Sequence, residues 1–244
     1  MSNERLRGTM NACGMGPTDL AERVQVDPKT VERWISLGRT PFRAHRWSVA
    51  KTLGVDPAYL WPDAENDMVV QKASTAELVA LYPNRGNVPA AMWTAIVEQA
   101  KQQVNLLVYA GLFWFDAYPD IIWTLLARAD AGVRIRLLFG DPESNAVSTR
   151  GDEEGIDVAA RVRMALRLIA PLLGHDSVQV RLHATTLYTS IYRADDIMLA
   201  NTHVYGAPAS HSPVLHLQRV PGGRLFEHYA RSYERVWDQA RQVN

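Results

Sequence analysis

The sequence has almost none of the features that mark secreted or membrane-spanning proteins. Cys13 is the only cysteine among 244 residues, so no internal disulfide can form and nothing indicates an oxidising compartment. The first ten residues, MSNERLRGTM, lack the apolar core of a signal peptide. The longest apolar run, Leu106 to Phe115, is too short to cross a bilayer and is more typical of a buried strand. We therefore expect a cytoplasmic protein without membrane contact.

Net charge is also absent, but the zero total conceals an uneven distribution. Residues 1–62 hold nine of the 26 Lys and Arg and six of the 26 Asp and Glu, a balance of +3, which leaves −3 for the remainder. Between Lys29 and Lys51, six basic residues stand against one acid, Glu32. A basic segment joined to a larger, slightly acidic one is typical of a DNA-binding head on another domain, although many such clusters are only solvated surface.

Gly, Pro and Asp divide the first part of the chain into five short predicted helices. The breaks fall at Gly14, Pro17, Asp27, Pro28, Gly38 and Gly54. In an Asp-Pro pair, Asp is a common N-cap and Pro a common first helical residue, and glycine commonly ends a helix. Residues 1–62 are therefore predicted to form an all-α domain. Residues 63–75 are polar, without a helical stripe or alternation, and predict a linker.

Within the all-α domain, the segment around Asp27 has helix-turn-helix spacing. Ala21 is small where two helices must approach closely, Val31 follows ten positions later, and Trp34 is a large apolar residue. The stretch TDLAERVQVDPKTVERWISLGRTP resembles the Cro/XRE-type helix-turn-helix family of bacterial repressors. One departure is Gln25, at a turn position that is commonly glycine. A non-glycine residue in the left-handed conformation costs about 1 kcal/mol.

The helix from Pro28 to Leu37 carries the side chains that a groove-reading helix requires. Short or bidentate donors near its N-terminus are expected to read bases, and a carboxylate can accept from cytosine. The expected base-reading residues are Lys29, Thr30, Glu32 and Arg33. The expected phosphate-binding residues are Arg39, Arg43 and Arg46. A helical bundle that only packs against a partner remains the alternative.

Residues 76–244 have the pattern of an α/β domain. VNLLVYAG and VRIRLLFGDP are predicted strands, and YPDIIWTLLARADAG between them is a predicted helix. Near-continuous apolar strands predict a parallel β–α–β unit covered on both faces. An amphipathic helix is expected from about Asp157 to Leu173, then the strands VQVRLH and TLYTSIYR, two further strands and a closing helix. The fold class expected is α plus α/β.

The run from Tyr188 to Gly206, with its surrounding elements, resembles the phospholipase D-like fold. That superfamily uses the motif H-x-K-x4-D, which reads Tyr188-x-Ser190-x4-Asp195 in this sequence. The resemblance implies the fold without its nucleophile and cation, because tyrosine is a weak nucleophile and serine carries no positive charge. A complete site in that family also uses two such motifs. We therefore expect a catalytically degenerate domain and no enzyme activity.

A domain of this kind retains a cleft where an effector can bind. The expected lining residues are Tyr188, Ser190, Asp195, Asn201 and His203, and the segments YAGLFWFD and FGDPES are expected to line the cleft as well. No metal or cofactor is expected, because His183, His203, His211 and His216 lack tight metal-ligand spacing. The chain as a whole is similar to actinobacterial XRE-family regulators with such a C-terminal domain.

These features together predict a homodimeric, sequence-specific transcriptional regulator. Its expected partner is double-stranded DNA carrying an inverted repeat, with the C-terminal domain used for effector sensing or dimerisation. Two alternatives stay open. One is a phospholipase D-type phosphodiesterase or nuclease with a DNA-targeting head. The other is a phage-type repressor or antitoxin whose large domain binds another protein.

Overall fold

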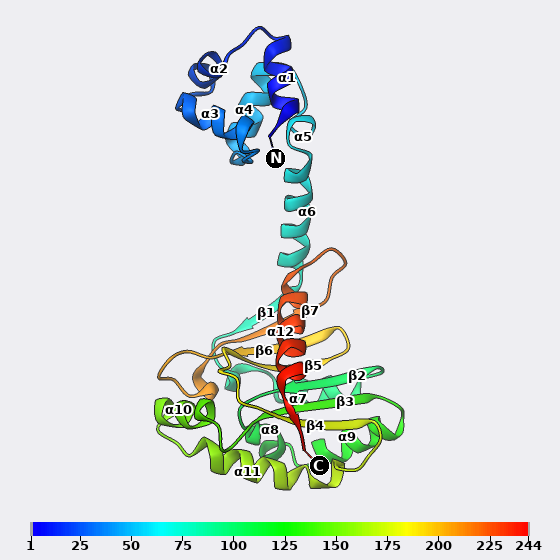
Figure 1. Ribbon diagram of the computed structural model, residues 1–244. Helices are drawn as coiled ribbons and strands as arrows, with labels where there is room; N and C mark the ends of the chain where they lie inside the picture. The colour runs from blue at the N-terminus through cyan, green and yellow to red at the C-terminus, as the bar shows by residue number, and fades with distance from the viewer. Residues whose placement is uncertain (1, 244) are drawn as a thin grey trace. The chain divides into compact units, whose positions relative to one another are not determined.

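The structure is a computed structural model that describes residues 2–243, except for the side chains of residues 65–68. Residues 1 and 244, the outer ends of the predicted domains, lie outside the described residues. The chain forms two compact units, one extending to Lys72 and the other beginning at Ala73. Figure 1 shows the elements of both.

Short helices make up the first unit, as predicted. In the described residues they are α1 (Glu4–Ala12), α2 (Pro17–Val24), α3 (Pro28–Ser36), α4 (Arg43–Leu53) and α5 (Pro57–Leu60). Apolar side chains from all of them form one core. Asp27 begins α3 as expected, because its side chain accepts a hydrogen bond from the Lys29 N–H at 2.8 Å.

The predicted linker is corrected in one respect, because residues 62–76 form a helix, α6 (Pro62–Ala76). The segment has no apolar stripe, so hydrophobic periodicity could not reveal it. Its composition carries the missing signal, since Ala, Glu, Lys, Gln and Met all favour helix. The division between the two units falls within α6, between Lys72 and Ala73.

The second unit is built on one mixed sheet with the strand order β1-β7-β6-β5-β2-β3-β4-β8. Its strands are β1 (Leu78–Tyr82), β2 (Gln103–Leu107), β3 (Arg134–Gly140), β4 (Val178–His183), β5 (Thr189–Ala194), β6 (Ile197–Thr202), β7 (Val214–Gln218) and β8 (Arg241–Gln242). Strands β2, β3 and β4 are parallel, which confirms the predicted β–α–β unit. The other neighbours are antiparallel.

Helices cover both faces of this sheet (Figure 1). They are α7 (Ala90–Glu98), α8 (Leu112–Ala117), α9 (Ile121–Asp130), α10 (Asn145–Glu154), α11 (Val158–Leu168) and α12 (Leu225–Gln239), with short turns η1 (Arg85–Asn87), η2 (Ala170–Leu172) and η3 (Ala209–His211). On β5, the Tyr192 ring contacts Trp93 of α7, whereas Arg193 lies over Phe226 of α12. Successive strand residues point to opposite faces, so α7 and α12 cover different faces.

Two predicted elements are shorter than expected. The run from Leu106 to Phe115 is not one strand: β2 ends at Leu107, and Gly111, with φ of 60°, precedes the start of α8. The helix expected from Asp157 to Leu173 ends at Leu168, and η2 follows with Pro171 near its start. Proline has no N–H to continue the helical hydrogen bonds.

None of the helices in the described part of the chain is long and apolar enough to cross a bilayer.

Candidate functional site

Helices α2 and α3 are joined by a turn and share one buried face. The buried residues are Leu20, Ala21 and Val24 of α2, and Val31, Trp34 and Ile35 of α3. Ala21 and Val31 are both completely buried in the core that these helices share. This packing leaves the polar side of α3 facing away from the core.

The turn between these helices depends on an unusual backbone conformation. Gln25 ends α2 in the left-handed region, with φ of 55° and ψ of 51°. The N–H of Val26 donates to the carbonyl of Ala21 at 3.0 Å and closes the turn. Gln25 stands at a turn position that is commonly glycine, and it adopts the left-handed conformation that glycine adopts most easily. For a non-glycine residue this costs about 1 kcal/mol.

The side chains expected to read bases lie on the polar side of α3. Lys29, Glu32 and Arg33 are exposed, and Thr30 is half-buried. Their nearest apolar neighbours in sequence, Val31 and Trp34, point into the core. The helix therefore presents two cations and one carboxylate from a rigidly packed element, which is the kind of surface that base reading requires.

The three arginines expected to bind phosphate do not have equivalent surroundings. Arg39 and Arg43 are exposed. Arg46 is half-buried, and its guanidinium donates to the carbonyl of Pro41 at 3.1 Å, so it supports the loop that joins α3 to α4. Two exposed aromatic residues, Phe42 and Trp47, flank these arginines and were not predicted as part of the surface. Their signal is the aromatic and basic alternation in RTPFRAHRW.

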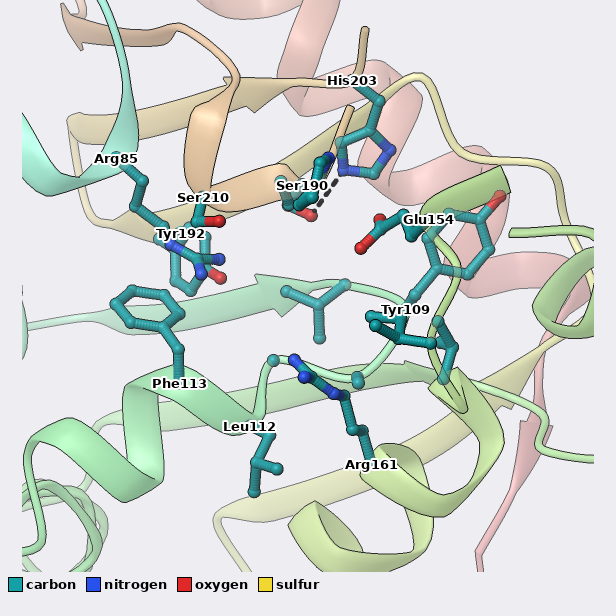
Figure 2. A pocket seen from close by; sticks show the side chains of 17 residues that line it. Arg85, Tyr109, Leu112, Phe113, Glu154, Arg161, Ser190, Tyr192, His203 and Ser210 are labelled. Carbon is teal, nitrogen blue, oxygen red and sulfur yellow. Dashed lines mark hydrogen bonds between the residues drawn. The ribbon is translucent and has the colours of Figure 1, made fainter. Parts of the chain in front are cut away.

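In the second unit, β5 and β6 bring three of the five predicted effector residues together. The Ser190 hydroxyl lies 2.9 Å from Nε2 of His203 (Figure 2). The backbone N–H of His203 donates to the carbonyl of Tyr188 at 2.8 Å, which places the exposed Tyr188 side chain nearby. Antiparallel pairing of β5 with β6 produces this proximity.

The protonation of His203 follows from its partners. Nδ1 lies 3.1 Å from the carbonyl oxygen of Leu187, which can only accept, so Nδ1 carries the proton. Nε2 is then free to accept from Ser190. Burial, with the positive charge of Arg150, lowers the pKa of His203 to about 4. An imidazole with so low a pKa is a weak base at neutral pH, so the Ser190–His203 pair is suited to hydrogen bonding rather than to activating a nucleophile.

Asp195 and Asn201 do not join this group. Asp195 follows β5 at the opposite end from Tyr188, with φ of 48°. Its carboxylate accepts three backbone N–H groups, from Lys101 at 2.7 Å, Gln102 at 3.0 Å and Gln103 at 2.9 Å. Asn201 is completely buried and donates to the carbonyls of Ser212 and Pro213, both at 3.1 Å. Both side chains stabilise loops, and neither lines the cavities described below.

The Tyr109 ring lies near two of the histidines considered as metal ligands, His183 and His203. Its ring stacks on His203 with centroids 5.7 Å apart and lies 6.0 Å from His183. His183 is held by the Val108 carbonyl at 3.1 Å, and burial lowers its pKa. Among the residues described, no group of three or more His, Cys, Asp or Glu side chains is arranged to hold a metal ion.

Two cavities adjoin Tyr109 and His203. The first, of about 300 Å³, is lined by Ser190, His203 and residues from η1, α8, α11 and η3. The second, of about 390 Å³, is lined by Arg150 and the exposed Tyr188 and Tyr205. Of the predicted cleft residues, Ser190 and His203 line the first cavity and Tyr188 and His203 line the second, whereas the segment FGDPES lines neither.

Several cavity residues could not be found by inspecting motifs. The most prominent are Arg85, Glu154, Arg161 and Tyr192. They come from segments far apart in the sequence and follow no fixed spacing. The predicted segment YAGLFWFD is the exception, because its residues 109–113 line the first cavity.

The sequence matches no model of a known protein family and no curated protein. Among solved structures, the chain is similar to Nuc from Salmonella typhimurium, a phospholipase D family member, with a TM-score of 0.43 and 14% identity over 68% of this chain and 97% of that one. It is also similar to TrmBL2, an archaeal chromatin protein whose structure shows a novel mode of DNA binding. That match has a TM-score of 0.44 and 12% identity over 89% of this chain and 72% of the other. At such low values, neither likeness assigns a family or a function.

Proposed function

We propose that this protein is a sequence-specific DNA-binding regulator of transcription. It acts as a homodimer on an inverted repeat, and α3 of each protomer enters a major groove. The α/β unit, of phospholipase D-like type, serves effector sensing or dimerisation and performs no catalysis.

One observation carries the proposal: α2 and α3 bury their apolar sides, including Ala21 and Val31, in one core. It fixes α3 with Lys29 and Arg33 outward, and Arg39 and Arg43 follow at its end. A helix held this way can place its N-terminal residues against base edges while later cations bind phosphate. Twofold symmetry requires half-sites about 10 bp apart.

The absence of catalysis is supported by three placements in the α/β unit. Tyr188, at the motif position of the nucleophile, is 81% exposed and outside the first cavity. The Ser190 hydroxyl forms a hydrogen bond with His203, whose imidazole is a weak base. The Asp195 carboxylate already accepts hydrogen bonds from three backbone N–H groups. Turnover of a phosphodiester that Asp195→Ala abolishes without unfolding the protein would contradict this part.

The test is selection of bound duplexes from a random or genomic pool. The wild-type protein should enrich an inverted repeat, and a Lys29→Ala/Arg33→Ala variant should not. Lys51→Ala, which removes an exposed cation near the end of α4, is the matched control and should enrich the same repeat.

On the selected operator, Arg33→Ala should cost about 1–3 kcal/mol of binding free energy and relax the preference at one base pair per half-site. Titrations against operators altered at single positions measure both effects. An equal loss of affinity for every duplex would instead make Arg33 a phosphate contact.

A further inference from the structure

The first cavity of the α/β unit has a positively charged wall that the proposed DNA-binding surface does not use. Arg85 comes from η1 and Arg161 from α11, and Figure 2 shows the two guanidinium groups approaching the cavity from different sides. The Arg85 guanidinium carbon lies 3.8 Å from the centre of the Phe113 ring, so an aromatic stack holds this charge at the wall.

The positive charges of this wall are not neutralised by nearby acids. No ion pair joins Arg85 or Arg161 to a carboxylate among the side chains that the structure describes. Glu154 also lines the cavity, but its carboxylate pairs with the buried Arg150 at 2.6 Å. A cavity with two guanidinium groups that pair with no described carboxylate, and with one glutamate that is already paired, favours an anion.

Hydroxyl groups extend this donor surface. Tyr192 is completely buried at the wall, and burial raises its pKa to about 12, so its hydroxyl stays protonated at neutral pH. Ser210 lines the cavity from η3. Guanidinium forks match the two oxygens of a carboxylate or phosphate, and hydroxyl donors can complete their coordination.

The size and the apolar part of the cavity limit what can bind. A volume of about 300 Å³ equals roughly ten waters at about 30 Å³ each, which suits a ligand on the order of ten heavy atoms. Val108, Leu112 and Phe113 add an apolar surface beside the charged groups. We infer that this cavity binds a small organic oxyanion, a carboxylate or phosphate joined to a flat apolar body, through Arg85 and Arg161.

The inference does not depend on the degenerate motif, because neither arginine belongs to it. It names the chemical class of the effector that the proposed site binds. It rests on the proposed function only for the effect that ligand binding has on the protein's activity. Measured without DNA, binding at this cavity and DNA reading by α3 succeed or fail separately.

The experiment is isothermal titration of the full chain with benzoate, benzamide and inorganic phosphate. Benzoate is a planar carboxylate that fits the volume, benzamide is its neutral isostere, and phosphate tests the oxyanion alone. Benzoate should bind at least about tenfold more tightly than benzamide. Phosphate binding without benzoate binding would also support the oxyanion site and identify phosphate as its preferred anion.

Variants assign the binding to this cavity. Arg161→Gln removes one charge from an exposed position on α11, so folding is retained, and it should weaken anion binding about tenfold or more. Arg85→Gln should act in the same direction. Arg167→Gln, an exposed arginine on the same helix that does not line the cavity, is the matched control and should bind as wild type does.

Three results would overturn the inference. The first is measurable binding of benzoate with an affinity equal to that of benzamide. The second is undiminished anion binding by Arg161→Gln. The third is no binding of either anion at millimolar concentration.

Discussion

At the scale of single residues, His203 is expected to make stability depend on pH. Burial and the charge of Arg150 lower its pKa to about 4, whereas a histidine in an unfolded chain titrates near about 6.5. The unfolded chain therefore binds an extra proton between these values. The contribution of His203 is complete above about pH 6.5 and is lost as pH falls towards 4.

This shift predicts a loss of about 2 kcal/mol of unfolding free energy from His203 between about pH 7 and pH 5. Urea denaturation of the full chain at both pH values, followed by near-UV circular dichroism, measures it. His203→Gln should be less stable at pH 7 but should lose less on acidification, since the remaining histidines, including His183, are common to both proteins. An identical pH dependence in the two proteins would contradict the shift.

Asp195 shows how one residue can be misjudged from a motif. Its position in H-x-K-x4-D suggested a place in the cleft, yet its carboxylate holds the backbone of residues 101–103. Aspartate tolerates the left-handed conformation and accepts several N–H groups, so the residue type suits a turn equally well. Only the hydrogen-bond partners distinguish the two roles.

At the scale of elements, the turn between α2 and α3 can be tested through Gln25. Gln25→Gly removes the strain of about 1 kcal/mol but increases the freedom of the unfolded chain, so stability should be unchanged or slightly higher. Gln25→Val places a β-branched side chain in the left-handed region and should destabilise by about 1 kcal/mol or more. Thermal unfolding of the full chain measures both, and a valine variant as stable as the glycine variant would contradict the turn geometry.

Elements also differ in how clearly the sequence predicts them. Asp27 and Pro28 predict the start of α3. Two apolar segments with a helical segment between them, followed by Gly132, predict β2, α9 and β3. Strand β1 received no prediction, because it is short and lies at the sheet edge beside β7, more than a hundred residues later in the chain. Pairing at such a distance leaves no local pattern.

At the scale of the whole molecule, the salt dependence of operator binding reports how many protomers contact DNA. Each phosphate contact contributes about 0.9 to the slope of log affinity against log salt. Arg43→Ala should therefore reduce the slope by about two in a homodimer and by about one in a monomer. Fluorescence anisotropy at several salt concentrations measures this, with Lys51→Ala as the control that leaves the slope unchanged. An unchanged slope in Arg43→Ala would remove Arg43 from the interface.

The sequence alone determined the features that depend on neighbouring residues. Helix starts and stops, the buried and exposed sides of α3 and the parallel β2–β3 unit all arise from local sterics and periodicity. The tertiary structure decided which distant groups meet: Ser190 with His203, Arg85 with Phe113, and Arg161 with the same cavity. It also decided that Asp195 and Asn201 serve loops. The physical reason is that cavities and charge pairing depend on the path of the whole chain, which no local spacing records.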